Sequence, residues 1–368
     1  MSAAPPTRRK SSPLQSQQGA LSWQQVHVAI VALGEPAARE QLEMLHGLLE
    51  RFVAENDCPR DSPHLRATGP DRLDPLAALL ARPDVAAASP AARLLALRAL
   101  KILARRGDVR LRCTQHVLNV VAPLLDAAAG APLELELASE AANALSNLCY
   151  EPINCTGLLK AGGVPRLLKL LCLESGGGEA RANAAGALQT LCLQPDARAA
   201  VLQAGGPARL LHALAGAGSS GSANAAGDAQ ARLQQRLAGA LHNLSSEAGG
   251  VAALRQQGGI PPVVGLLASP HPGVAAAAAG ALQNMSREAQ ARADIRAHPD
   301  ALPGLVMLLT GADTQAAVCA AGTLANLAEE GCSSAARQVL TQALAGALAG
   351  GAIYHSLGDG AIGTQGGT

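Results

Sequence analysis

The stretch Ala141-Ala-Asn-Ala-Leu-Ser-Asn-Leu-Cys149 decides the fold, because the chain repeats its pattern several times. A polar break, a short apolar run and the sequence Gly-Gly-Val-Pro at 162–165 follow it. The same order of features returns at 184–207, 237–261, 278–303 and 320–343. A chain that repeats one pattern of this length predicts a solenoid, in which each unit packs mainly on its neighbours.

Two sets of positions give the period. The polar residue near the end of the Ala-Leu-x-Asn-Leu motif recurs at intervals of 43, 53, 41 and 42 residues. We call these five positions the ladder residues: Asn147, Thr190, Asn243, Asn284 and Asn326. Prolines at 75, 123, 165, 207, 261 and 303 form a second set of marks with the same long interval. A period of about 40–47 residues is typical of all-helical repeat arrays.

Three peptides resemble the armadillo repeats of catenins and vacuolar scaffolds. They are Ala-Gly-Ala-Leu-His-Asn-Leu-Ser at 238–245, Ala-Gly-Ala-Leu-Gln-Asn-Met-Ser at 279–286 and Gly-Gly-Val-Pro at 162–165. The resemblance covers about 73–348 and implies an all-α fold, an armadillo-type right-handed superhelical solenoid of about six repeats. The composition agrees. With four aromatic residues among 368, the core must consist of Leu, Val and Ala, and Ala and Leu are strong helix formers.

The chain divides into four segments. We expect a disordered tail at 1–20, an N-terminal helical cap or degenerate repeat at 21–72, the repeat array at 73–348 and a Gly-rich tail at 349–368. Within the array, 215–228 is a Gly/Ala/Ser-rich insertion. It explains the long interval, because a surface loop can lengthen at small entropic cost. The first unit of the array departs from the motif, since Ile102 stands where Asn is expected.

Charge and cysteine usage limit the partners and the compartment. The 29 basic and 28 acidic residues provide no broad positive field, so we predict no nucleic-acid binding. The eight cysteines show no zinc-ligand spacing, and Cys149 and Cys192 each follow a core Leu at the same repeat position. That pattern predicts buried thiols in a reducing compartment. We therefore predict a cytoplasmic protein, with the nucleus as a second compartment.

Two segments leave alternatives open. The basic sequence Arg8-Arg9-Lys10 suits a disordered tail, a phosphorylation site or an organellar transit peptide. The uncharged run at 338–357 raises the question of membrane association, but its glycines favour a repeat helix.

The ladder residues are the candidate binding site. Helical periodicity places Leu145 and Leu148 on the core face and Asn147 well away from it, in line with Asn143. Stacked once per repeat, the ladder resembles the asparagine array with which armadillo proteins hold an extended peptide. An amide offers donors and an acceptor, so it suits a peptide backbone. We add Asn143, His242 and Gln283 as groove-lining residues. The alternative is that each Asn bonds only its neighbouring helix or loop.

One turn before four of the ladder residues the chain has glycine, at 186, 239, 280 and 322. Importin-α-like proteins have tryptophan at this place, to form slots for lysine side chains, so the absence of tryptophan disfavours that role. Glycine there has two readings. It allows a partner backbone to approach closely, or it gives neighbouring helices space to pack.

These patterns predict a protein that binds other proteins and is not an enzyme. We expect no catalytic residues, no cofactor and no metal, and a concave, Asn-lined groove that binds an extended segment of a partner. One alternative is the substrate-binding or regulatory part of a ubiquitin-ligase system, because some ligases that resemble this family attach such repeats to a catalytic domain. A second alternative is a membrane-associated armadillo scaffold.

Overall fold

The computed structural model describes residues 21–67, 69, 71–126, 131–173, 177–217 and 225–328, and all regular structure within them is helical. The predicted tails at 1–20 and 349–368 and the run at 338–357 lie outside the described residues, as do residues 218–224 of the predicted 215–228 insertion. No described helix is long and apolar enough to cross a membrane.

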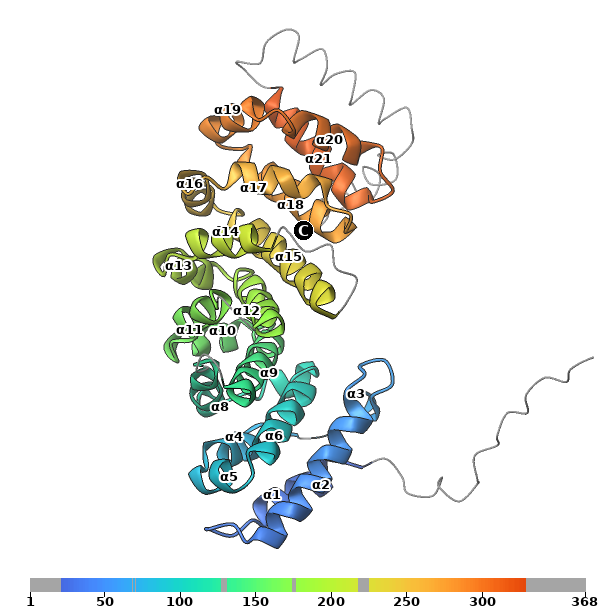
Figure 1. Ribbon diagram of the computed structural model, residues 1–368, viewed down its shortest axis with the longest axis vertical. Coiled ribbons are helices and arrows are strands. Elements are labelled where there is room, and N and C mark those ends of the chain that lie inside the picture. Colours follow the sequence, from blue (N-terminus) through green and yellow to red (C-terminus); the bar gives the residue numbers. More distant parts are fainter. Residues whose placement is uncertain are drawn as a thin grey trace, which may run out of the picture.

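Six units of three helices, preceded by a helix pair, form one elongated array (Figure 1). The pair is α1 (Trp23–Val31) and α2 (Arg39–Asn56). The first unit has α3 (Pro63–Arg66), α4 (Asp74–Ala81) and α6 (Pro90–Leu103), with the short α5 (Pro83–Ala88) inserted. The second has α7 (Gly107–Arg110), α8 (Gln115–Val121) with the 3₁₀ turn η2 (Ala122–Leu125), and α9 (Pro132–Leu148). The all-α solenoid predicted from the sequence is confirmed.

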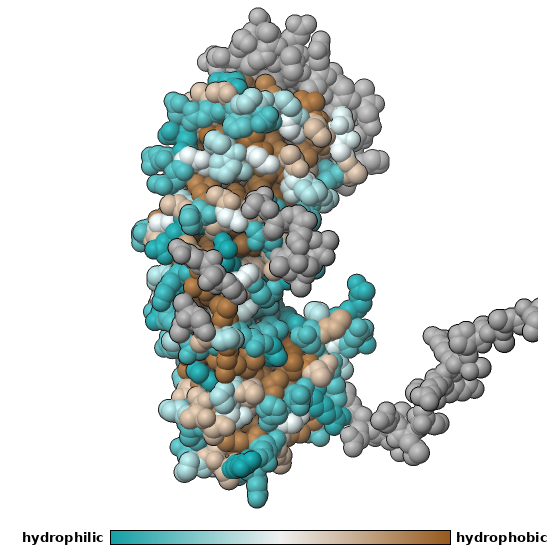
Figure 2. All heavy atoms as spheres, in the orientation of Figure 1, coloured by the Kyte–Doolittle hydropathy of each residue, from teal (hydrophilic) through white to brown (hydrophobic). Residues whose placement is uncertain are grey.

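The remaining four units follow the same order. They are α10 (Pro152–Lys160), α11 (Gly163–Leu171) and α12 (Gly178–Leu191); α13 (Pro195–Gln203), α14 (Gly206–Gly216) and α15 (Ala225–Leu244); α16 (Ala248–Gln256), α17 (Ile260–Gly265) with η3 (Leu266–Ala268), and α18 (Pro272–Met285); α19 (Ala289–Ala297), α20 (Ala301–Leu309) and α21 (Thr314–Leu327). On the face drawn in Figure 2, hydrophilic residues cover most of the left edge and apolar residues show between successive layers.

Glycine in the left-handed conformation joins the first and second helices of three units. Gly162, Gly205 and Gly258 have φ of 68°, 71° and 69°. A side chain is strained at such φ values, so glycine is needed where the chain reverses direction. The Gly-Gly pairs of the sequence therefore mark these turns.

Pro123 is not equivalent to the other prolines. Pro75 lies in the first turn of α4, whereas Pro123 lies in η2, after α8 has ended. The start of α8 is fixed instead by Thr114, whose hydroxyl accepts a hydrogen bond from the backbone N–H of Val117 at 3.5 Å. An N-cap hydroxyl and a first-turn proline both suit a helix start, so proline alone gives the wrong register in this unit.

Side chains from the first helices hold the ends of the preceding third helices. Arg110 Nη1 donates to the carbonyl of Arg105 at 2.8 Å, and Arg198 Nη1 donates to that of Cys192 at 2.8 Å. Asn154 and Arg292 make similar bonds, both at 3.0 Å, to Leu148 and Ser286. They satisfy carbonyls that a helix end leaves without intrahelical donors. The equivalent residue of α16 is Val251, which has no such group.

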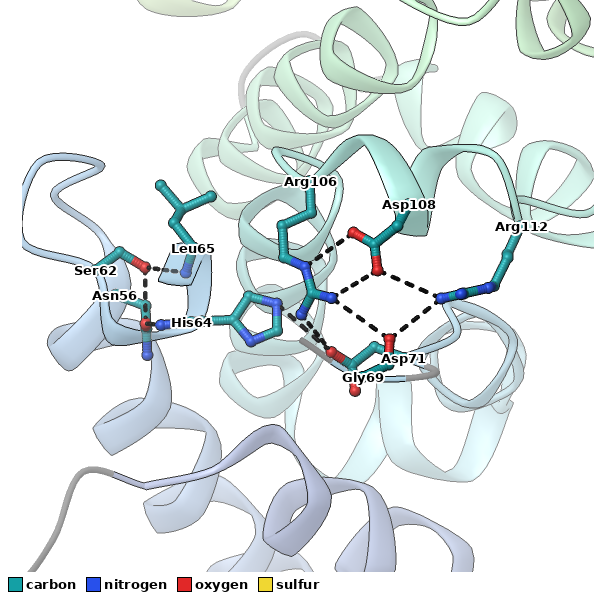
Figure 3. A network of polar contacts seen from close by, with 9 residues as sticks. All are labelled: Asn56, Ser62, His64, Leu65, Gly69, Asp71, Arg106, Asp108 and Arg112. Atoms are coloured by element: carbon teal, nitrogen blue, oxygen red, sulfur yellow. Dashed lines mark hydrogen bonds and ion pairs between the residues drawn. The ribbon is translucent and has the colours of Figure 1, made fainter. Parts of the chain in front are cut away.

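Aromatic contacts pack the N-terminal pair on the first unit, and an ion cluster joins the first unit to the second. Phe52 lies between Trp23 and His64, with ring centroids 5.6 Å from each. Figure 3 shows the guanidinium of Arg106 at the centre of the cluster, bonded to Asp71 at 2.7 Å and to Asp108 at 2.6 Å. These bonds fasten the loop between α3 and α4 to the start of α7.

Candidate peptide-binding groove

The ladder residues lie in a row across the array. Each third helix packs on the next one, from α6 through α9, α12, α15 and α18 to α21. These helices lie along the right-hand side of Figure 1. Each ladder residue is the last but one of its helix, immediately before Leu148, Leu191, Leu244, Met285 and Leu327. The five positions are therefore structurally equivalent.

Each ladder asparagine donates a hydrogen bond to the preceding unit. Nδ2 of Asn147 donates to the carbonyl of Lys101 at 3.2 Å, and Nδ2 of Asn243 donates to that of Gln189 at 2.9 Å. Asn284 donates to the carbonyl of His242 at 3.4 Å and to Ser245 Oγ at 3.2 Å, and Asn326 donates to Ser286 Oγ at 2.9 Å. The bond to the neighbouring helix, which the sequence leaves as an alternative, is thus present.

The carbonyl oxygens of these amides have a different environment. Across the described ranges, Oδ1 of the four ladder asparagines accepts no hydrogen bond, and none of these oxygens is among the buried atoms without a partner. Because Nδ2 is held by the preceding unit, the orientation of each amide is fixed. Each ladder asparagine therefore presents an acceptor, and at least one of its two N–H donors serves the fold.

Thr190 does not present such a group. Its side chain is buried, with 6% of its surface exposed, and its hydroxyl donates to the carbonyl of Gly186 at 3.1 Å. Ser146 Oγ lies 3.2 Å away on the other side. Threonine in a helix often bonds the carbonyl four residues earlier, and here that bond withdraws the hydroxyl from the surface. The structure therefore does not support Thr190 as a groove-lining residue.

The three other predicted groove residues differ from one another. Asn143 is half-buried, and its side chain makes no hydrogen bond to the rest of the described chain. His242 and Gln283 are half-buried and lie across glycines of the next unit. A Cβ added at Gly280 would lie 2.7 Å from His242 Nε2, and one at Gly322 would lie 2.2 Å from Gln283 Nε2. Burial lowers the pKa of His242.

The glycines one turn before the ladder provide packing space. Gln189 lies across Gly239 in the same way, with Nε2 2.1 Å from the position of an added Cβ. At Gly186 the preceding unit supplies only the short Ser146, and Arg236 of the following unit fills the space, with Cδ 3.1 Å from an added Cβ. Of the two readings of these glycines, helix packing is the one that the structure supports.

Comparison with known proteins agrees with this architecture. The armadillo/beta-catenin-like repeat family matches residues 248–287. A designed armadillo repeat protein in complex with the peptide (KR)4 superposes with a TM-score of 0.55 at 21% identity, over 69% of this chain and 99% of that one. A structure described as concerning a phosphorylation switch in the interaction between cadherin and beta-catenin has a TM-score of 0.62 at 17% identity, over 91% of this chain and 57% of that one.

The chain contains an armadillo/beta-catenin-like repeat within an armadillo-type solenoid. An engineered protein is similar to it as well, with a TM-score of 0.56 at 26% identity, over 69% of this chain and 96% of that one. No curated protein sequence matches the chain.

A pocket lies beside the ladder of this armadillo array, between the ends of α15 and α18. Its volume is about 420 Å³. It is lined by Ser245, Ser246, Glu247, Ala248, Val251, Ala252, Asn284, Arg287 and Glu288. Val251 stands at the helix position where α7, α13 and α19 have the arginines that cap the preceding third helix. The shorter, apolar side chain leaves space at this seam.

Ion pairs between third helices were not predicted from the sequence. Lys101 Nζ lies 2.9 Å from Glu140 Oε2 and Arg98 Nε lies 3.0 Å from Glu140 Oε1, which joins α6 to α9. Arg232 Nη2 lies 2.6 Å from Glu179 Oε2, which joins α12 to α15. Opposite charges one repeat apart on third helices are the signal that could have found them. The described residues contain no His, Cys, Asp and Glu cluster able to hold a metal ion.

Proposed function

We propose that this armadillo-repeat protein is a scaffold that binds an extended segment of another protein along the third-helix face. One observation carries the proposal: in equivalent positions, Oδ1 of Asn147, Asn243, Asn284 and Asn326 accepts no hydrogen bond from any described residue. An extended segment presents backbone N–H groups in a row, and fixed acceptors can receive them without reading the side chains. Recognition here involves no chemical step.

Similar proteins support this choice of partner. The designed armadillo protein cited above is in complex with a peptide, and the beta-catenin structure concerns an interaction with cadherin. The small net charge of +1 favours a protein segment over nucleic acid. We place this activity in the cytoplasm or the nucleus.

A random dodecapeptide display library, panned against the full chain, tests the proposal. Enriched peptides are synthesised with a fluorescent label, and their affinity is measured by anisotropy. The comparison uses a variant in which Asn147, Asn243, Asn284 and Asn326 are all changed to Ala, with helicity checked by circular dichroism. We expect binding to fall at least about tenfold, since several bonds of about 1 kcal/mol are lost. Unchanged affinity in a folded variant would remove the ladder as the site.

A further inference from the structure

The residue three positions after each ladder residue occupies the same turn in four successive units. We call Tyr150, Leu193, Ser246 and Arg287 the edge residues. Their backbone N–H groups donate to the carbonyls of the preceding ladder residues at 3.4, 3.1, 3.3 and 3.3 Å. Identical backbone bonds place the four side chains at equivalent points, so they form a row beside the ladder.

The first two edge residues are large and apolar. The side chain of Tyr150 is 59% exposed and that of Leu193 is 50% exposed, although both follow fully buried leucines by only two residues. Arg110 holds the tyrosine, with Cζ 5.7 Å from the ring centroid. Neighbouring exposed apolar side chains of this size mark a contact surface more often than scattered single ones do.

The fourth edge residue supplies an unpaired charge. Arg287 is exposed, and its guanidinium makes no ion pair or hydrogen bond within the described part of the chain. The two carboxylates that line the same pocket are already paired. Glu247 pairs with Arg198, and Glu288 lies 3.1 Å from Arg255 Nε. Among the described residues, the pocket therefore carries one positive charge without an ion-pair partner, next to the amide of Asn284.

We propose that the bound segment carries an aliphatic or aromatic side chain over Tyr150 and Leu193 and an aspartate or glutamate on Arg287. The inference rests on the proposed function and adds the chemistry of the partner. A carboxylate suits an exposed guanidinium because the two can form paired, charge-assisted hydrogen bonds. Ser246 lies between the two contacts and accepts small or polar side chains.

The geometry also sets the spacing of the two anchors. Leu193 and Arg287 follow α12 and α18, which are two helices apart in the array. Packed helices lie about 8–10 Å apart, so the two anchors are separated by about 16–20 Å. An extended chain rises about 3.3 Å per residue. The acidic residue is therefore about five or six positions from the apolar one.

The peptides enriched by panning on the full chain test this pattern. We expect them to combine an aliphatic or aromatic residue with Asp or Glu about five or six positions away. Arg287→Glu should weaken their binding at least about tenfold, and changing their acidic residue to Lys should restore binding to that variant. Arg209→Glu is the matched control, because Arg209 is an exposed arginine on α14 and lies outside the ladder and the edge row.

The apolar anchor is tested by Leu193→Ser, with Met307→Ser as the control, since Met307 is 73% exposed on α20. We expect weaker binding from the first change only. Peptides that need the ladder asparagines but show no acidic preference and bind Arg287→Glu equally well would overturn this inference and leave the proposed function standing. Peptides that bind the fourfold Asn variant unchanged, or a library that yields no binders, would count against both.

Discussion

The imidazole of His242 lies across Gly280 of the next unit, so close that a Cβ on the glycine would lie 2.7 Å from Nε2. The two residues form a contact between successive units, because the side chain of His242 fills the space that Gly280 leaves by having no side chain. The same relation joins Gln189 to Gly239 and Gln283 to Gly322.

Gly280→Ala should therefore destabilise the protein by about 1–3 kcal/mol, because the imidazole must leave its place. Chemical denaturation of the full chain measures the change. In a His242→Ala background the same substitution should cost much less, since the obstructing side chain is gone. Gly265→Ala is the control, because apart from its chain neighbours and its own helical backbone no atom lies within 4 Å of its added Cβ. An equal loss of unfolding free energy in both backgrounds would contradict the packing of His242 over Gly280.

Asn147→Ala should lower the free energy of unfolding by about 1 kcal/mol, through loss of the bond from Nδ2 to the carbonyl of Lys101. Leu145→Ala, two residues earlier, should cost about 2–5 kcal/mol, because Leu145 is fully buried. Thermal and urea melts compare the two variants. A loss for Asn147→Ala as large as that for Leu145→Ala would show that the amide is mainly structural.

His64 should make the protein less stable in mild acid. Its side chain is 4% exposed, its Nε2 accepts no hydrogen bond and lies 4.0 Å from Asp71 Oδ2, and burial, followed by the charge of Arg106, lowers its pKa below 6.5. Asp71 and Asp108 oppose this shift. Between the folded pKa and 6.5 the unfolded chain binds more protons, so stability is full above that window and falls as the pH falls through it.

His64→Gln should reduce this pH dependence, measured as the difference in urea midpoint between pH 7.5 and pH 5.5. His242 also has a pKa lowered by burial and contributes a further slope of the same sign, so the variant should retain part of the effect. An identical slope in wild type and variant would exclude His64 as a source.

The cysteines should differ in reactivity. Burial raises the pKa of Cys192 to about 12 and that of Cys113 to about 12, whereas Cys58 is exposed. Alkylation needs the thiolate, so iodoacetamide at neutral pH should modify Cys58 and spare the other two in the native protein. Peptide mapping by mass spectrometry measures the labelling, and urea should make all three react. Rapid native labelling of Cys192 would contradict its burial.

The repeat period and the third helices could be predicted from the sequence, because Ala, Leu and Asn recur at fixed places and helical periodicity assigns their faces. Asn147, Asn243, Asn284 and Asn326 are accordingly equivalent in space. The hydrogen bonds of the individual amide atoms could not be predicted, because they depend on which carbonyl of the preceding unit lies within reach. Thr190 is the example. Its position in the repeat matches that of the ladder asparagines, but its short side chain bonds its own helix.

The second helices show a different limit. Proline at 123 has the right approximate spacing, yet Thr114 starts the helix of that unit. The role of the glycines was also undecided by the pattern, because the side chain that crosses each one comes from a neighbouring unit. These contacts join residues 38–50 positions apart, and a single sequence shows little sign of which residues form them.

Val251 occupies a position that has a capping side chain in other first helices. At the other seams a guanidinium or an amide fastens the end of a third helix to the helix that follows, and at α16 a short aliphatic chain leaves that fastening out. We therefore expect the array to bend most easily between α15 and α16. Leu193 and Arg287 lie on opposite sides of this contact. A bound segment that contacts both residues would therefore restrict the bending.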